Sequence, residues 1–189
     1  MANSVSHSAL PYPIKGARFT IQIPFLDADG DPTDPTTPDT EISKDAGAYA
    51  DCAEEVTTIT GTNGSGYITL TGAETDASML MLAAKVASGP KATLATLYPR
   101  KLPSIGTGTL SAGSAGGGTL GTILAYDITG CLIKTTGGTG GGGAGGLSNQ
   151  ARVIDTYNTG TGAFTVVPNW ETTPDATTTY DLLLPTGLM

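Results

Sequence analysis

Residues 137–185 read GGTGGGGAGGLSNQARVIDTYNTGTGAFTVVPNWETTPDATTTYDLLLP. Two β-rich hydrophobic runs in this stretch, ARVIDTY and AFTVVPNW, flank a Gly- and Thr-rich segment at residues 158–162, which is typical of a β-hairpin. The stretch holds one tryptophan and almost no side chains that act as nucleophiles, acids or metal ligands. It therefore indicates a rigid β-surface, and a structural or binding role before an enzymatic one.

The composition of the whole chain points the same way. Only 14% of the 189 residues are charged, whereas 27 are glycine, and threonine is abundant. Threonine suits the pleated surface of a strand, and glycine supplies the positive φ angles of tight turns. The sequence therefore predicts an all-β protein of two small β-sandwich or barrel-like domains with Gly-rich loops and less than a tenth helix.

The charge of the chain excludes several classes of partner. A net charge of −8 repels nucleic-acid phosphate and anionic membranes, so we expect no nucleic acid and no membrane as partners. We find no signal-peptide pattern and no apolar run long enough for a membrane helix. Cys52 and Cys131 lie far apart without a CxxC partner, which indicates two buried free thiols.

Local signals divide the chain into three parts: an extended arm at residues 1–13, a β-sandwich at 14–102 and a second β-domain at 103–189. Hairpin turns are expected at Asp45-Ala46-Gly47 and at Asn63-Gly64. Thr71 and Glu74 form a capping-box pattern that predicts a helical turn at residues 72–77. The runs MLMLAAKV and KATLATLY are expected to pair as strands.

Two segments carry candidate docking residues. In the arm, Leu10, Tyr12 and Ile14 are interleaved with prolines, and such segments bind by lying along a partner. At the other end, Leu182, Leu183 and Leu184 are adjacent on a predicted strand. Because side chains alternate between the faces of a strand, at least one of these leucines faces away from its own core, and we expect an exposed patch that mediates self-association.

The remaining reactive side chains give weak signals for chemistry. The acidic segment that begins at Asp27 fails the EF-hand pattern, because Pro32 and Pro38 stand where that loop needs Gly and Glu; an acidic loop in solvent is favoured over a calcium site of another type. His7 lies in the arm without a nucleophile elbow, and the glycine tract at 137–146 lacks the Lys-Ser/Thr of a phosphate-binding loop. We therefore expect no catalytic, cofactor-binding or metal-binding residues.

Three further residues of the second domain have two interpretations each. Trp170 and Tyr157 are expected in the core, with a glycan-stacking platform as the alternative. Arg152 is expected to pair with Asp155 or Asp175 in a structural role.

The motifs GARFTIQIPFLD, EISKDAGAYADC and YITLTGAETDA make the first half resemble the small β-domains near the N-termini of tailed-phage fibre and baseplate proteins. The second half resembles a companion phage β-module through GGTGGGGAGGLSNQARVI, Tyr157, Trp170 and PDATTTY. The resemblance spans about residues 14–185 and rests on structural motifs. It implies a virion protein, and it implies three-fold association of identical copies.

These observations together predict a non-enzymatic bacteriophage structural protein, located in the virion after synthesis in the host cytoplasm. The leading hypothesis is an accessory subunit of the tail, neck or fibre-attachment apparatus. It would form a homotrimer and bind tail, neck or portal-adaptor proteins. A capsid decoration protein bound to the major capsid protein is the alternative, and a host-glycan adhesin is a weaker one.

Overall fold

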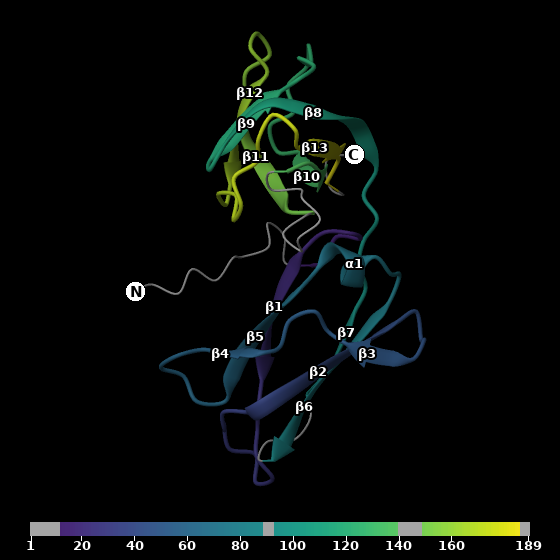
Figure 1. Ribbon diagram of the computed structural model, residues 1–189, viewed down its shortest axis with the longest axis vertical. Coiled ribbons are helices and arrows are strands. Elements are labelled where there is room, and N and C mark those ends of the chain that lie inside the picture. Colours follow the sequence, from purple (N-terminus) through teal and green to yellow (C-terminus); the bar gives the residue numbers. More distant parts are fainter. Residues whose placement is uncertain (1–11, 89–92, 140–148, 186–189) are drawn as a thin grey trace.

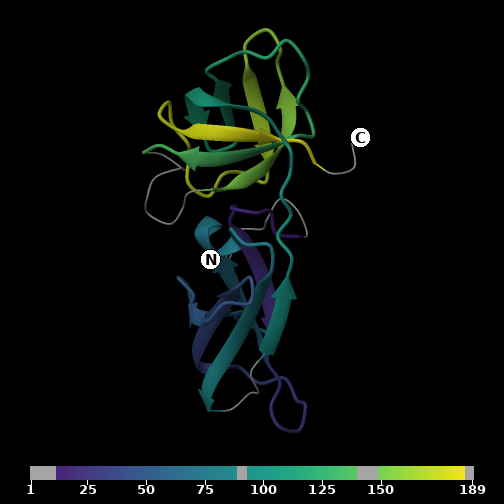
Figure 2. The same cartoon turned by 90° about the vertical axis from the view of Figure 1, so that its right-hand side faces the viewer.

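The protein is all-β, as the sequence predicts. Its structure, a computed structural model, describes residues 12–88, 93–139 and 149–185. The single helix in these residues is α1 (Gly72–Thr75), and every other named element is a strand. Figures 1 and 2 show two β units stacked along the long axis, with residues 98–103 passing from the first to the second.

The first unit is a sandwich of two antiparallel sheets. One sheet has the order β1 (Phe19–Pro24), β5 (Ser65–Leu70), β4 (Thr57–Thr58). The other has the order β3 (Tyr49–Asp51), β2 (Thr36–Lys44), β6 (Leu80–Ser88), β7 (Thr93–Leu97). Buried side chains of both sheets form one cluster, to which Ile23 and Ile68 contribute from the first sheet and Ile42 and Leu82 from the second.

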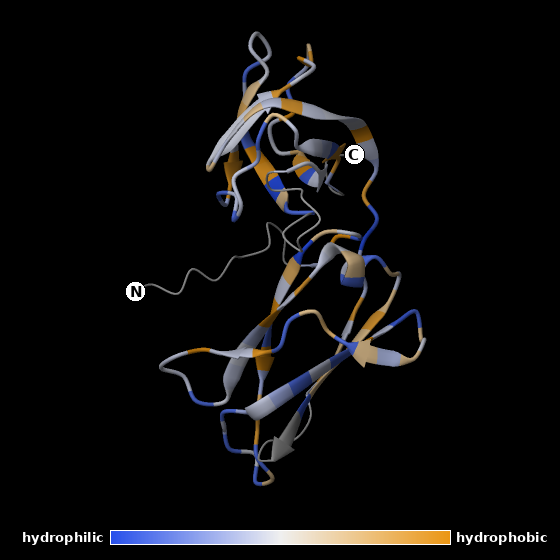
Figure 3. Cartoon of the chain, in the orientation of Figure 1, coloured by the Kyte–Doolittle hydropathy of each residue, from blue (hydrophilic) through white to orange (hydrophobic). Residues whose placement is uncertain are grey.

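Strict alternation makes β5 a strand with one buried face. Ile68 and Leu70 are buried, whereas Tyr67 and Thr69 between them are half-buried. Figure 3 shows hydrophobic positions recurring along the strands of both units among polar ones. This period of two places one row of apolar side chains in the core of each unit.

Turn residues fix the connections that the sequence predicts. Asp45 and Ala46 have φ of 49° and 61°, and they join β2 to β3 in an antiparallel hairpin. Gly64 has φ of +70°, and a Cβ there would lie 2.6 Å from the Phe25 carbonyl oxygen, so only glycine fits. The expected pairing of MLMLAAKV with KATLATLY is confirmed by β6 and β7.

The capping box at the start of α1 is also confirmed. The Thr71 Oγ1 accepts from the Glu74 backbone N–H at 3.3 Å, and the Thr71 N–H donates to Glu74 Oε2 at 2.7 Å. The helix ends at Thr75, two residues before the predicted end. Its C-cap, Asp76, has ψ of 65°, which is outside the helical range.

The second unit is a closed six-stranded antiparallel barrel. Around the barrel the order is β10 (Leu132–Gly137), β11 (Ala151–Tyr157), β12 (Ala163–Val167), β9 (Gly117–Leu120), β8 (Ser104–Ser114), β13 (Thr179–Leu183). The predicted hairpin is confirmed by β11 and β12, which pair across residues 158–162. Most of the glycine tract, residues 140–146, lies outside the described residues.

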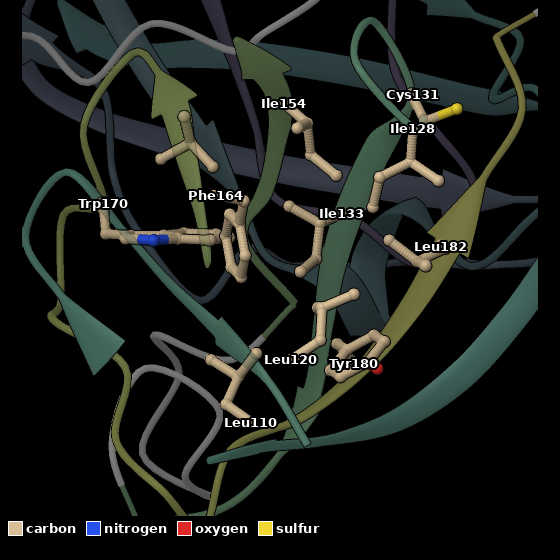
Figure 4. Close-up of a cluster of buried hydrophobic side chains, with 11 residues drawn as sticks. Leu110, Leu120, Ile128, Cys131, Ile133, Ile154, Phe164, Trp170, Tyr180 and Leu182 are labelled. Atoms are coloured by element: carbon tan, nitrogen blue, oxygen red, sulfur yellow. The ribbon is translucent and has the colours of Figure 1, made fainter. Parts of the chain in front are cut away.

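Apolar side chains from all six strands and their loops fill the barrel. Figure 4 shows Trp170 beside Phe164, with Leu120 and Tyr180 on the far side of the same cluster. Trp170 is buried, as expected for a core residue, and its indole Nε1 donates to the Gly117 carbonyl at 3.2 Å. Among the residues that the structure describes, no helix has the length and apolar character to cross a bilayer.

Candidate functional site: the junction of the sandwich and the barrel

The predicted docking residues of the arm meet the rest of the chain at this junction. The Tyr12 ring lies under the Arg100 guanidinium, 4.6 Å from Cζ to the ring centroid. The backbone N–H of Arg100 donates to the Pro13 carbonyl at 3.0 Å, and the backbone N–H of Lys15 donates to the Arg100 carbonyl at 2.9 Å. Ile14 is only 5% exposed. Residues 12–15 therefore pack on their own chain.

The remaining residues of the expected arm, Leu10 among them, lie outside the described part of the chain.

The expectation of an exposed leucine patch is wrong. Leu182 is 1% exposed inside the barrel, and the half-buried Leu184 packs against the same cluster. Leu183 points out of the barrel, as alternation requires, yet it is only 3% exposed. It belongs to a separate cluster at the junction, composed of Ile14, Ala17, Leu102, Leu132, Ala151 and Leu183. The surface that covers Leu183 belongs to the same chain.

A carboxylate ties the two units together across this apolar contact. The Arg18 Nη1 donates to Glu171 Oε2 at 2.5 Å, and the Arg152 Nη2 donates to Glu171 Oε1 at 3.1 Å. Arg18 immediately precedes β1, whereas Arg152 and Glu171 belong to the barrel. We call these three residues the Glu171 clamp.

Arg152 is held by more than the carboxylate. It is 3% exposed, and it donates from Nε to the Asn169 carbonyl at 3.0 Å and from Nη1 to the Ala151 carbonyl at 2.9 Å. Burial lowers the pKa of Arg152, and the hydrogen bond and charge of Glu171 oppose that shift. The predicted pairing with Asp155 or Asp175 is wrong, because the carboxylate that Arg152 meets is that of Glu171. Asp155 is exposed at an irregularity of β11, and Asp175 accepts from Thr177 and Thr178.

A backbone hydrogen bond fastens a loop of the barrel to the sandwich: the Arg18 backbone N–H donates to the Asn149 carbonyl at 3.0 Å. Within the sandwich, the Thr75 Oγ1 of α1 donates to the carbonyl of Ala17, the residue before Arg18, at 2.7 Å. A Cβ at Gly72 would lie 2.5 Å from the Asn149 side-chain nitrogen, so the helix start and this loop approach closely.

A cleft of about 780 Å³ opens beside these contacts. Three lysines line it, Lys15, Lys101 and Lys134, together with the carboxylates Asp76 and Asp181. Its apolar wall comes from the junction cluster, through Ile14, Leu102 and Leu183.

The cleft and the Glu171 clamp contain most of the basic residues of this acidic chain. Six of its nine lysine and arginine residues lie at the junction: Lys15, Arg18, Arg100, Lys101, Lys134 and Arg152. We did not predict this cluster of basic residues from the sequence. The signal was present in the clustering of scarce basic residues at 15, 18, 100 and 101, next to the two boundaries that the sequence predicts.

The acidic loop after β1 uses its carboxylates to hold its own backbone. The Asp27 Oδ1 accepts from the backbone N–H groups of Asp29 and Asp31, both at 2.9 Å. The hydrogen bond from Asp31 is the main cause of a lowered Asp27 pKa. The Asp34 Oδ1 accepts from the Gly64 N–H at 2.7 Å. These contacts stabilise turns.

A second acidic group lies on the other sheet. The carboxylate oxygens of Asp39, Glu41 and Asp51 all lie within 4.8 Å of one another. The Lys85 ammonium is 2.5 Å from Glu41 Oε2, and this hydrogen bond is the main cause of a raised Lys85 pKa. A side-chain cation thus already balances part of this charge.

The two cysteines are free thiols, as expected, but only Cys131 is buried. Cys52 is half-buried, and burial together with the charges of Glu74 and Glu55 raises its pKa to about 12. A thiol with this pKa is protonated at neutral pH and is a poor nucleophile.

The candidate glycan platform does not form from Trp170 and Tyr157. Trp170 is 5% exposed and packs in the barrel core. Tyr157 packs against the same core, and its hydroxyl accepts from the Leu124 N–H at 2.7 Å. Both rings therefore act as core residues.

Comparison of the chain with protein-family models, with curated proteins and with solved structures finds no match.

Proposed function

We propose that this chain is a non-enzymatic structural subunit of a tailed-phage virion, in the tail, neck or fibre-attachment apparatus. The observation that carries the proposal is the Glu171 clamp. Two charged pairs and a buried apolar cluster at the junction hold a sandwich and a barrel against each other. A subunit that transmits load between neighbours needs such a fixed geometry between its binding surfaces.

The use of the carboxylates supports a role without catalysis. Asp27 and Asp175 bind backbone N–H groups of their own loops, and the Asp45 Oδ1 accepts from the N–H groups of Ser78 and Met79. General acid–base catalysis requires a group with a pKa near the working pH. The pKa values of Asp27 and Asp175 are instead lowered by these hydrogen bonds.

The identity of the partners follows from the resemblance described above. It implies association of identical copies, commonly as trimers, and contact with tail, neck or portal-adaptor proteins. The leucine run no longer supports self-association, because Leu182 and Leu183 are covered within the chain. The host-glycan adhesin hypothesis is also weakened, because Trp170, which was to form the aromatic platform for a glycan, is buried.

Antibody labelling of purified particles tests the proposal. We expect gold particles at the tail, the neck or the fibre attachment site of the phage that encodes this chain. Labelling over the whole head would replace the tail assignment with the capsid-decoration alternative. Particles that remain unlabelled, although the antibody binds the isolated protein, would contradict a virion role.

A further inference from the structure

The charges in the junction cleft are unevenly matched. Its two carboxylates already have partners: Asp76 lies 3.9 Å from the Lys15 Nζ, and Asp181 accepts a hydrogen bond from the Ser104 Oγ. The ammonium groups of Lys101 and Lys134 have no ion pair or hydrogen bond with any residue of 12–88, 93–139 or 149–185. The Ser104 hydroxyl carries no charge, and Asp181 is the cross-strand partner of Lys134 on β10 and β13. Three lysines therefore face two carboxylates, and the lining of the cleft has a net charge of +1.

The backbone places one of these cations at the cleft. Lys134 is on β10 and is half-buried. Gly16 has φ of +71°, and a Cβ at this position would lie 3.5 Å from the Lys134 Nζ. The turn at residues 15–16 thus passes directly beside the ammonium group. This position restricts Lys134 to the cleft, whereas Lys101 is exposed at its rim.

The cleft is cationic above an apolar floor. Ile14, Leu102 and Leu183 line it beside the three lysines, and each is at most 5% exposed because these residues pack against one another. A concave site concentrates the field of its charges, so a cleft with a net positive charge attracts anions even on an acidic protein. Its volume of about 780 Å³ is far larger than a single carboxylate or phosphate group needs, and is within the range of sites for larger ligands.

We propose that the junction cleft binds an acidic peptide segment of a partner protein. Carboxylates of the segment pair with Lys101 and Lys134, which line the cleft above its buried apolar floor. The inference rests on the proposed structural function, because it names where and through which chemistry a neighbouring virion protein attaches. Peptide binding is measured on the isolated protein, so its failure would leave the labelling experiment unaffected.

A titration of the full-length ¹⁵N-labelled chain tests the proposal. The probe is a blocked peptide of alternating glutamate and leucine, and the reference is the same peptide with glutamine in place of glutamate. We expect shifts of the backbone amides of Gly16, Leu102 and Lys134 with the glutamate peptide alone. Added salt should weaken the binding, because it screens the charges.

Single Lys→Gln substitutions, each of which removes one positive charge, then locate the site. Lys101→Gln and Lys134→Gln should each weaken binding about threefold, the effect expected of one partly exposed ion pair. Lys85→Gln makes the same change in net charge on the far sheet, next to Glu41, and should leave affinity unchanged within error. The spectrum of each variant reports whether it is folded, and Lys101 is exposed enough for its removal to be tolerated.

Four results would overturn the proposal. These are the absence of shifts at the cleft, equal binding by the lysine variants and the wild type, equal binding of inorganic phosphate, and a large gain in affinity on truncation after Pro185. Equal phosphate binding would show a site for small anions. A gain of tenfold or more after truncation would show that residues 186–189 of the chain itself compete for the cleft.

Discussion

Arg18 and Glu171 are separated by 153 positions in the sequence, and they meet at 2.5 Å across the junction. The second oxygen of Glu171 accepts from Arg152, whose side chain is 4% exposed. One carboxylate therefore bridges two guanidinium groups, one from each side of the junction. Because Arg152 lies deeper than Arg18, the two halves of the Glu171 clamp are not equivalent.

We predict that Glu171→Gln destabilises the protein more than Arg18→Ala. Glu171→Gln leaves the buried Arg152 cation with neutral acceptors only, which should lower the free energy of unfolding by about 3 kcal/mol, the lower end for a buried pair because the Glu171 side chain is 21% exposed. Arg18→Ala removes a partly exposed partner and should cost about 1 kcal/mol. Urea denaturation measures both values.

Asp76→Asn is the matched control for the clamp. Asp76 is 63% exposed, and it makes a loose ion pair with Lys15 at the same junction. Its removal should change the free energy of unfolding by less than about 0.5 kcal/mol. A cost for Arg18→Ala equal to or above that for Glu171→Gln would show that the depth of Arg152 does not matter.

Leu183 should behave as a core residue and not as an interface residue. Leu183→Ala removes apolar contacts with the junction cluster, and should lower the free energy of unfolding by about 2–4 kcal/mol. Leu94 is 69% exposed, and Leu94→Ala should change it by less than about 0.5 kcal/mol. Light scattering should give the same mass for Leu183→Ala and the wild type. Loss of assembly without loss of stability would restore the leucine patch as an interface.

Two neighbouring glycines of the barrel should differ sharply in their tolerance of alanine. A Cβ at Gly117 would lie 2.0 Å from the Phe164 carbonyl oxygen on the paired strand β12, so Gly117→Ala must push β9 and β12 apart. We expect a cost of more than about 3 kcal/mol, or failure to fold. At Gly116 the nearest atom is the Asn169 Oδ1 at 3.6 Å, an ordinary contact. Gly116→Ala should therefore shift Tm by less than about 4 °C, and similar Tm values for the two variants would contradict the close approach.

Asp175 should make stability depend on acid pH. Hydrogen bonds from Thr177, followed by Thr139, lower its pKa to about 2. The unfolded chain therefore binds more protons than the folded one between about pH 4 and pH 2, and stability falls as pH falls through this window. The Tm difference between the wild type and Asp175→Asn should be full above pH 5 and should shrink toward pH 2. A difference that is constant with pH, or a carboxyl that titrates near 3.8, would contradict the assignment.

The strands and turns were predictable because their signals are local. Alternation marks β5, and the short segment Asp45-Ala46-Gly47 forms the expected turn, in which Asp45 and Ala46 have positive φ. The capping box of Thr71 and Glu74 spans only four positions. Such features depend on neighbours within a few residues, so the sequence alone indicates them.

The junction was not predictable in the same way, because its partners are remote in sequence. The alternation of side chains along β13 correctly predicts that Leu183 points out of the barrel. Only the fold shows that Ile14 and Leu102 cover it there. Arg152 pairs with Glu171 and not with Asp175. The hydroxyl groups of Thr177 and Thr178 already donate to the Asp175 carboxylate. Periodicity gives the face of a strand, and long-range packing decides what that face meets.

The copy number of this chain in gradient-purified phage particles tests the structural role most directly. Quantitative mass spectrometry with labelled standard peptides measures its ratio to the major capsid protein. We predict a fixed ratio that corresponds to tens of copies per particle and survives a high-salt wash. A chain that is abundant in the lysate but absent from the purified particles would contradict the account.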